Sequence, residues 1–331
     1  MISRSVTILR SLRYPSGLFS AAKKSVGTGY DKSWLRDNIY ESLGLEAAGL
    51  IDEAVGTLHA LLDALKKHEY KIDWAIKEKP QHKHQYIHAR VHPLTFDEFH
   101  EDWGNKQNDS IGAILFKIGD LENKGVRVLR DEGDKRIVQK LVRYLASIEY
   151  WHDADNGMWE ENEEIHASSV GACVAGLHAV SRLTDVPKWL IEKGVSALDE
   201  LLPCESATKD VDLALLSLIY PYNIVDEETR DAILKNVEKK LVRARGVLRY
   251  AGDKYYNNGR GEAEWTMGFP WLAAIYRQMG CPEKYIWYLT LAESAMNPEG
   301  EMPELYYSGE SRHNENTPLG WAQSLLIVAK A

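Results

Sequence analysis

The chain has 331 residues, of which 44% are hydrophobic and 27% are charged, a composition typical of a soluble globular protein with a sizeable core. Its formal net charge of −9 argues against a nucleic-acid-binding surface, which requires a basic patch. No apolar run approaches the roughly 20 residues of a membrane-spanning helix, so no membrane partner is expected either.

The first 24 residues contain five basic and no acidic residues, a composition that resembles a transit peptide. Residues 7–9 and 17–19 instead suggest short structured pieces around a turn at residues 14–17, which favours a genuine part of the fold. Three scattered cysteines suit neither a disulfide framework nor a zinc knuckle, so a reducing, cytoplasmic setting is expected. They are Cys173, Cys204 and Cys281.

Helical periodicity recurs at short intervals along the rest of the chain. The predicted helices span residues 38–50, 53–67, 109–121, 135–148, 169–183, 188–201, 211–219, 227–242, 264–279, 282–295 and 318–330. Strand-like pieces are short and local, at residues 85–91 and 247–250. Because strands and helices do not alternate and no linker composition appears, the pattern predicts one all-α domain over residues 1–331.

The most distinctive residues lie in loops between these helices. Five loops pair aromatic with hydrogen-bonding side chains, at residues 34–38, 103–109, 159–164, 249–265 and 302–321. Such pairing suits a pyranose, because the ring stacks on the apolar face of the sugar and the polar group binds its hydroxyls. Loops of this kind on a helical scaffold usually line a site.

The loop that begins at Trp159 places Glu160 and Glu161 directly after an aromatic residue and before a helix. Glycoside hydrolysis needs a carboxylic acid held partly out of water, so that its pKa rises, and an aromatic wall helps to do this. The alternative is a solvated, acidic helix start that complements the helix dipole, which is an equally plain interpretation of Glu161.

The Arg36–Asp37 pair before the first predicted helix also has two interpretations. Arginine and aspartate can bind sugar hydroxyls together, but Asp37 can instead be a helix N-cap, and the same alternative applies to Asp109.

The sequence contains no clear motif for metal binding or phosphate binding. Five histidines crowd one segment, but they form no HExxH or similar ligand motif, and Pro93 argues against a single helical face. No GxGxxG, Walker or GxSxG pattern appears. We therefore expect no metal and no cofactor. The five histidines are His82, His84, His88, His92 and His100.

Taken in order, the loop motifs resemble the glucoamylase family of glycoside hydrolases (family 15), most closely the glucoamylase-like domain of the phosphorylase kinase α and β subunits and its microbial relatives. The resemblance runs from near residue 7 to near residue 328. The motifs that carry it lie at residues 17–21, 34–40, 103–109, 159–161, 166–171, 262–265, 302–307 and 318–325.

This resemblance implies an (α/α)6 barrel with six inner and six outer helices and an active site at one open end. It further implies an inverting α-glucosidase, with Glu160 as general acid and Glu304 as general base. Positions that match sugar-binding residues of the family are Arg36, Asp37 and Arg249, and those that match residues around the scissile bond are Trp103, Trp159 and Glu161. Further site-lining or supporting positions are Trp34, Gln107, Asp109, Glu264, Trp265 and Trp321.

Several departures from the family narrow the expected substrate. We see no N-terminal β-sandwich and no starch-binding domain, and the loops that wall off distant subsites look short. A small gluco-oligosaccharide, maltose-like or trehalose-like, is therefore expected. Trp265 and Trp321 also fit core positions just inside helices. The main alternative function is a non-hydrolytic carbohydrate-binding or regulatory module like the kinase-subunit domain. A purely structural helical scaffold explains the helices but not the Trp–carboxylate loops.

Overall fold

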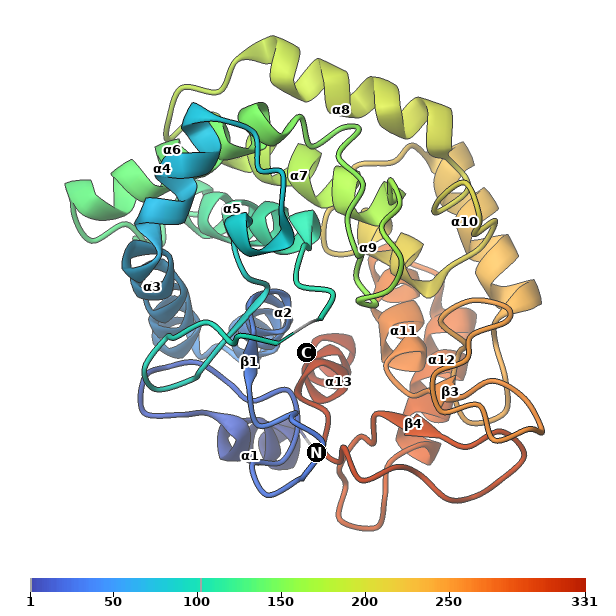
Figure 1. Cartoon of the computed structure of the whole chain (residues 1–331). Coiled ribbons are helices and arrows are strands. Elements are labelled where there is room, and N and C mark those ends of the chain that lie inside the picture. Colours follow the sequence, from blue (N-terminus) through green and yellow to red (C-terminus); the bar gives the residue numbers. More distant parts are fainter. Residues whose placement is uncertain (1, 102) are drawn as a thin grey trace.

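The inner part of the molecule is a closed ring of six helices, each packed against the next (Figure 1). The computed structural model describes residues 2–101 and 103–331. The ring closes because the last helix packs against the first. Its members are α2 (Leu35–Ala47), α5 (Asn108–Asn123), α7 (Ala167–Val180), α9 (Leu216–Ile219), α11 (Gly268–Gln278) and α13 (Gly320–Lys330).

Six outer helices surround this ring, each packed on an inner partner. The outer helices α3, α6, α8, α10 and α12 follow their inner partners in the chain, whereas α1 packs on α13 and so joins the two ends of the chain. The architecture is an (α/α)6 barrel, as the family resemblance implies. The outer helices are α1 (Ile2–Leu12), α3 (Ile51–Lys67), α6 (Glu132–Ile148), α8 (Lys188–Leu201), α10 (Glu227–Lys240) and α12 (Pro282–Ser294).

Side-chain size explains which helices form the inner ring. The inner helix α7 is rich in small residues and is buried on nearly every side. Gly112 of α5 lets the two helices approach, because an added Cβ there would lie 2.3 Å from the Ala172 carbonyl carbon. Outer helices have instead one apolar stripe, as in α6, where Ile137, Leu141 and Leu145 are buried and the opposite side is exposed.

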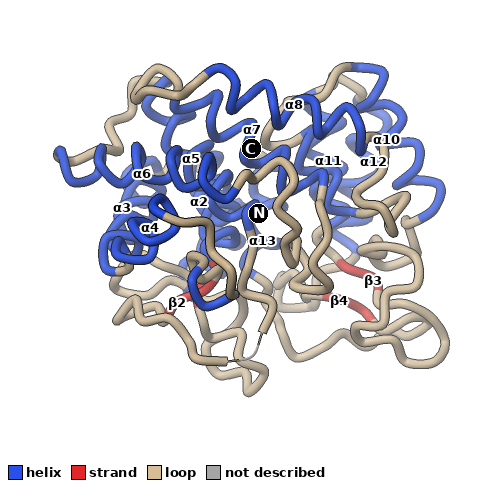
Figure 2. The backbone as a smooth tube through the Cα atoms, turned by 45° about the horizontal axis from the view of Figure 1, so that its top comes forward, coloured by secondary structure: helices blue, strands red, loops and turns tan. Residues whose placement is uncertain are grey.

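Two short antiparallel sheets lie among the loops at one end of the barrel (Figure 2). β1 (Ser33–Trp34) pairs with β2 (Arg90–Val91), with Trp34 opposite Arg90. β3 (Glu264–Trp265) pairs with β4 (Leu305–Tyr306), with Trp265 opposite Leu305. These sheets join loops that are distant in the sequence at the end where the inner helices begin.

The predicted helices are confirmed apart from local differences. Residues 264–265 form β3, so the helix predicted from residue 264 begins at residue 268. The predicted helix at residues 211–219 is a 3-10 turn (Leu213–Leu215) followed by the short α9. The additional helix α4 (Glu69–Lys77), which packs on α6 and α3, was not predicted. Of the predicted strand at 85–91, only β2 is extended in a sheet.

The N-terminal arm is part of the fold, as expected. Residues 2–12 form α1, whose Val6, Leu9 and Leu12 are buried in one cluster with Ile327 of α13. Within the described ranges, no helix has the length and apolar character needed to cross a membrane.

Candidate active site

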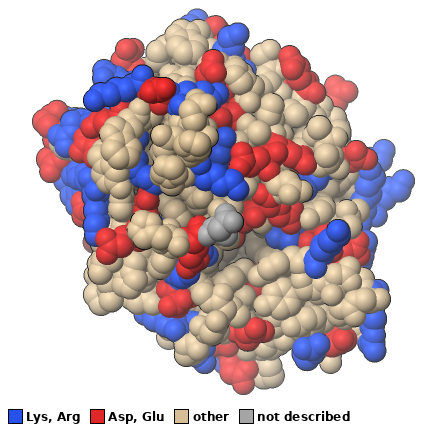
Figure 3. Space-filling view, in the orientation of Figure 1, with Lys and Arg blue, Asp and Glu red and all other residues tan. Residues whose placement is uncertain are grey.

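A cavity of about 460 Å³ opens at the end where the inner helices begin. Its volume lies within the range of roughly 300–1,000 Å³ that small-molecule sites occupy. On this face the surface is hollowed near its centre, and acidic side chains gather beside the hollow (Figure 3). Most of the expected site residues line this cavity together: Trp34, Arg36, Asp37, Trp103, Trp159, Glu160, Glu161, Arg249, Trp265, Glu304 and Trp321.

Glu160 is a carboxyl group held partly away from water, with its side chain 23% exposed. Burial raises its pKa to about 7, although Arg36 and the indole N–H of Trp34 favour the charged form. Trp34 Nε1 donates to Glu160 Oε1 at 2.5 Å, and Arg36 Nη2 lies 3.7 Å from the same oxygen. The backbone of Glu160 is left-handed, with φ 66°, which is unusual for a residue with a side chain and is typical of functional sites.

Glu304 is the second carboxyl group, and it is fully buried. Its Oε2 accepts hydrogen bonds from the side-chain amides of Asn314 and Asn316, the latter at 2.8 Å. Its Oε1 has no hydrogen-bond partner among the described residues. Burial raises the pKa of Glu304, whereas both asparagines and the nearby Tyr30 hydroxyl oppose the rise. One oxygen is therefore fixed and the other is available to a ligand.

Two expected site residues that do not line the cavity hold Arg36 in place through hydrogen bonds. Its Nη1 donates to Gln107 Oε1 at 2.8 Å and to Asp109 Oδ2 at 3.2 Å. Neither Gln107 nor Asp109 borders the cavity, so both support a site residue rather than form the wall. Glu264 is the third expected site residue that does not line the cavity. It accepts a hydrogen bond from the backbone N–H of Arg245 at 2.7 Å.

The N-cap alternative for Asp37 and Asp109 is wrong. The N-caps of α2 and α5 are Trp34 and Gln107, and neither caps its helix through its side chain. Asp37 lies three positions after its N-cap and Asp109 two positions after its own, so both are in the first helical turn. Burial raises the pKa of Asp37 to about 6, and Asp109 adds to the rise, while Arg36 opposes it.

Both carboxylate oxygens of Glu161 accept hydrogen bonds from neighbouring side chains. Its Oε1 accepts from Arg249 Nη2 at 3.0 Å and from the Tyr250 hydroxyl at 2.7 Å, and its Oε2 accepts from Lys209 at 2.8 Å. Arg249 in turn is fixed by two 2.7 Å bonds to Asp253. These contacts, more than a helix dipole, account for the position of Glu161.

Aromatic rings form much of the remaining wall. Trp159 stacks near Trp321 at 6.1 Å between centroids and contacts Trp265 at 5.9 Å. Trp265 and Trp321 are only 4% and 3% exposed, so they are core residues that also border the cavity. The Arg249 guanidinium lies 4.8 Å from the Trp265 ring centroid. Flat rings beside fixed charges suit the mixed apolar and polar faces of a sugar.

Arg90, Tyr30 and Tyr255 are among the cavity residues that were not expected as site residues. Arg90 reaches the cavity through its pairing with Trp34 in the β1–β2 sheet, and its guanidinium lies 3.8 Å from the Trp103 ring centroid. Tyr30 and Tyr255 contact each other through their hydroxyls at 3.1 Å. Tyr255 belongs to the aromatic loop at 249–265 and so carried a signal in the sequence, whereas Tyr30 and Arg90 lie outside the recognised motifs.

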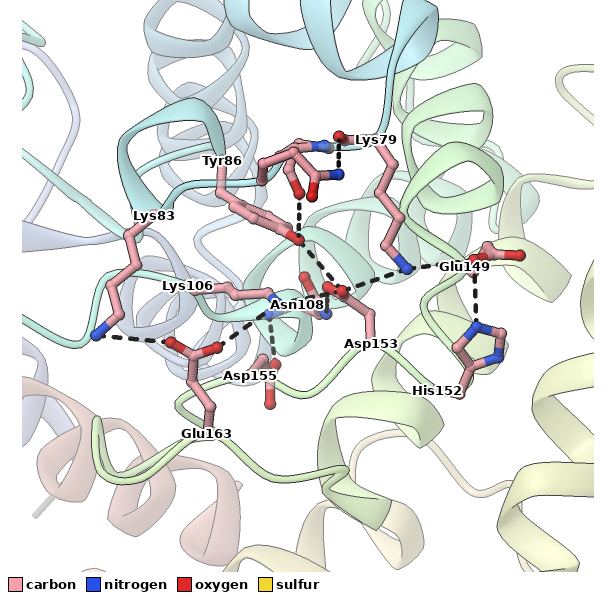
Figure 4. Close-up of polar contacts among 12 residues, drawn as sticks. Lys79, Lys83, Tyr86, Lys106, Asn108, Glu149, His152, Asp153, Asp155 and Glu163 are labelled. Atoms are coloured by element: carbon pink, nitrogen blue, oxygen red, sulfur yellow. Dashed lines mark hydrogen bonds and ion pairs between the residues drawn. The ribbon is translucent and has the colours of Figure 1, made fainter.

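Buried polar side chains fasten the Glu160 loop to the start of α5 (Figure 4). Asp155 accepts the backbone N–H of Asn108 at 2.7 Å, and Asp153 accepts the Asn108 side-chain amide and Lys106. Asn156 bridges the two segments, because its Oδ1 accepts the Lys106 N–H at 3.2 Å and its Nδ2 donates to the Glu161 carbonyl at 2.6 Å.

The histidine-rich segment is dispersed. His82 and His84 stack at 5.6 Å between centroids on the exposed 3-10 turn Lys83–Gln85, whereas His88 is buried beside Trp103. Within residues 2–101 and 103–331, no group of three or more His, Cys, Asp or Glu side chains is arranged to hold a metal ion.

The sequence is similar to two groups of proteins. A probable phosphorylase b kinase regulatory subunit alpha of Caenorhabditis elegans is 24% identical over 89% of this chain and 30% of the worm protein. The liver isoform of this subunit from Oryctolagus cuniculus is 27% identical over 76% of this chain and 23% of its own length. An uncharacterized glycosyl hydrolase of Methanocaldococcus jannaschii is 24% identical over 67% and 41%, respectively. The chain spans less than half the length of each relative.

Solved structures share the fold. A glycosidase variant in complex with glucose superposes with a TM-score of 0.83 at 19% identity and covers 99% of this chain and 96% of its own. A bacterial glucoamylase complexed with acarbose gives a TM-score of 0.75 at 16% identity, over 98% of this chain and 54% of its own. The model of the family described as glycosyl hydrolases family 15 matches residues 1–189. Since that match covers more than half of the 331 residues, the chain belongs to glycosyl hydrolases family 15.

Proposed function

We propose that the protein is an inverting, exo-acting α-glucoside hydrolase that acts on small gluco-oligosaccharides. The observation that carries the proposal is the pair Glu160 and Glu304, one partly buried and one fully buried carboxyl group with different surroundings that line one cavity. Inverting glycosidases use one carboxylic acid and one carboxylate on opposite faces of the sugar, about 6.5–9.5 Å apart.

Glu160 is the proposed general acid. With a pKa of about 7 it keeps its proton under mildly acidic conditions. Because Oε1 accepts the Trp34 indole N–H, the proton belongs on Oε2, from which it passes to the glycosidic oxygen as the C1–O bond breaks. The carboxylate that remains is stabilised by Arg36, which lies 3.7 Å away.

Glu304 is the proposed general base. Asn314 and Asn316 hold Oε2, so Oε1 is the atom that accepts a proton from the attacking water. The water oxygen bonds to C1 on the face opposite the leaving group, and the product is the β-anomer. Afterwards Glu304 loses a proton to solvent and Glu160 gains one, which restores both starting states.

The remaining wall suits recognition of a terminal sugar. Arg36, Asp37 and Arg249 offer fixed hydrogen-bonding groups, and Trp159 offers a flat apolar surface. Glu161 is already bound to Arg249, Tyr250 and Lys209, which leaves Glu160 as the carboxyl group free to act as the acid.

The decisive experiment measures glucose released from maltose, isomaltose, trehalose and longer malto-oligosaccharides, with the product anomer read by NMR. We expect β-glucose from at least one α-linked substrate. Glu160→Gln and Glu304→Gln should each lower kcat by about 10²–10⁴-fold, the usual contribution of a general acid or base. An α-anomer product, or variants that keep full activity, would reject the proposed mechanism.

A second candidate is a carbohydrate-binding module without hydrolysis. It is favoured by the similarity to proteins named as regulatory subunits of phosphorylase b kinase. Isothermal titration with maltose and maltotriose distinguishes the two. Binding with no glucose release over hours, in the wild type as in Glu160→Gln, supports the module and rejects the enzyme.

A further inference from the structure

Two aromatic side chains of α4 are exposed at the surface. Tyr70 is 48% exposed and Trp74 is 55% exposed. They lie one helical turn apart, with ring centroids 5.1 Å apart in an edge-on contact. Large aromatic side chains are usually buried for most of their area, and neighbouring exposed ones often mark a binding surface. Among the described helices, α4 belongs to neither the inner nor the outer ring of the barrel.

The surface beside Trp74 is hollowed and polar. A cavity of about 270 Å³ lies there, and its lining includes Lys77, Glu78, Gln81 and Gln85. Gln85 Oε1 accepts the backbone N–H groups of Gln81 at 2.8 Å and His82 at 2.9 Å, so the loop holds its own shape. Its amide N–H donors therefore remain for a ligand.

Two charged side chains that line this hollow have no partner among the residues that the structure describes. Lys77 and Glu78 form no ion pair or side-chain hydrogen bond with the residues that the structure describes. Trp74 donates its indole N–H to none of these residues either. The hollow thus combines a flat ring with an ammonium, a carboxylate and an amide.

This combination matches a saccharide better than other partners. A pyranose has an apolar face for the indole and hydroxyls for the surrounding polar groups. A protein partner fits less well, because lysine and glutamate are depleted from the centres of protein interfaces. A nucleic acid is disfavoured by the net charge of −9.

We propose that Trp74 and the polar hollow beside it form a surface binding site for a glucan chain, separate from the active-site cavity. The choice of an α-glucan rests on the proposed α-glucoside hydrolase, and it extends the proposed substrates from small oligosaccharides to longer chains. Lys71 of the same helix donates to Glu98 at 2.6 Å and to the Tyr86 carbonyl at 2.9 Å. These bonds attach α4 to the segment that supplies Arg90 and Trp103 to the active-site cavity.

A surface site on α4 would aid the hydrolysis of long substrates. A long glucan held at Trp74 is tethered to the same molecule as the active site, so its ends meet the cavity at a raised effective concentration. Short substrates gain nothing from this, because they cannot reach both places. Removal of Trp74 should therefore affect polymers and spare disaccharides.

The test is native gel electrophoresis of the full chain through gels that contain glycogen or, separately, dextran. The control is Trp287→Ala, which removes another exposed tryptophan, 62% accessible on α12. We expect retardation of the wild type and of Trp287→Ala. Trp74→Ala should bind at least about fivefold more weakly, and Trp74→Phe should keep part of the binding, because it keeps a ring. Disaccharide turnover and the melting temperature of Trp74→Ala should be unchanged.

Several results would overturn the site. One is equal retardation of wild type and Trp74→Ala, and another is equal loss in the Trp287→Ala control. A concentration-dependent elution volume that Trp74→Ala abolishes would identify a self-association surface instead. The outcomes also separate this site from the proposed activity. Trp74-dependent glucan binding without hydrolysis rejects only the enzyme, and hydrolysis without such binding rejects only the surface site.

Discussion

The two candidate catalytic carboxyl groups differ both in their surroundings and in their burial, since the Glu160 side chain is 23% exposed and Glu304 is fully buried. Glu160 accepts one indole N–H and lies near Arg36, whereas Glu304 accepts two side-chain amides on one oxygen. Burial raises the pKa of both, which favours chemistry in mildly acidic solution.

These shifts predict a bell-shaped pH dependence of kcat/KM. Activity should fall as the pH rises through about 7, because Glu160 then loses the proton it must donate. It should also fall in acid, at a pH above the ordinary glutamate value of 4.5, because Glu304 then becomes protonated. Initial rates at low substrate concentration across the pH range check both limbs.

Trp34→Phe tests the assignment of the alkaline limb. The indole N–H favours the carboxylate form of Glu160, so its removal should raise the pKa of Glu160 and move that limb to higher pH. The acid limb should stay in place, since Trp34 makes no hydrogen bond to Glu304. An unchanged alkaline limb, or a shift to lower pH, would mean that another group controls it.

At the scale of elements, the loop that carries Glu160 depends on the start of α5. Asn156 joins Lys106 to Glu161 through its side chain, and Gly104 lies against Glu160, where an added Cβ would be 2.7 Å from the Glu160 carbonyl oxygen. Small displacements of an acid are costly because proton transfer requires close alignment.

Asn156→Ala should therefore lower kcat at least about tenfold with a smaller change in KM. The matched control is Asn162→Ala on the same loop, where the side chain is exposed. Steady-state kinetics of both variants, at equal folded fraction by circular dichroism, provide the measurement. A loss of melting temperature with unaltered kcat would show a purely structural role for Asn156.

The contact between α5 and α7 gives a second prediction at this scale. Gly112→Ala inserts a methyl group where the Ala172 carbonyl carbon lies 2.3 Å away, and such overpacking typically costs about 1–3 kcal/mol. The free energy of unfolding in urea should fall accordingly. Gly27→Ala, where nothing lies within 4 Å, should change it little. Equal stability of the two variants would contradict the close packing of these helices.

For the whole molecule, the buried acids link stability to pH. Burial raises the pKa of Asp37 to about 6 and that of Glu160 and Asp155 to about 7. The folded protein then holds protons that the unfolded chain releases between about pH 4 and pH 7. The stability that comes from these groups is present below that window and is lost as the pH rises through it.

We therefore expect the melting temperature to fall between about pH 4 and pH 7. Glu160→Gln removes one of the responsible groups, so its melting temperature should fall less over the same range and exceed the wild-type value at pH 8. Differential scanning fluorimetry at constant ionic strength measures both curves. Parallel curves for the two proteins would show that Glu160 does not titrate in this window.

The sequence by itself determined the helical fold, the family and about half of the residues that line the cavity. Apolar spacing located most helices, and the Trp–carboxylate loops carried the recognisable motifs. Residues such as Glu160 and Trp159 were found because their neighbours in the chain form part of the same motif.

Only the tertiary structure decided which polar residues face the cavity and which support it. Gln107 and Asp109 lie in a recognised motif, yet they bind Arg36 outside the cavity, because the N-cap and first turn of α5 direct them there. Arg90 carried no motif, and it reaches the cavity because the β1–β2 register sets it opposite Trp34. Strand register and helix rotation depend on contacts between distant segments, which local sequence patterns do not encode.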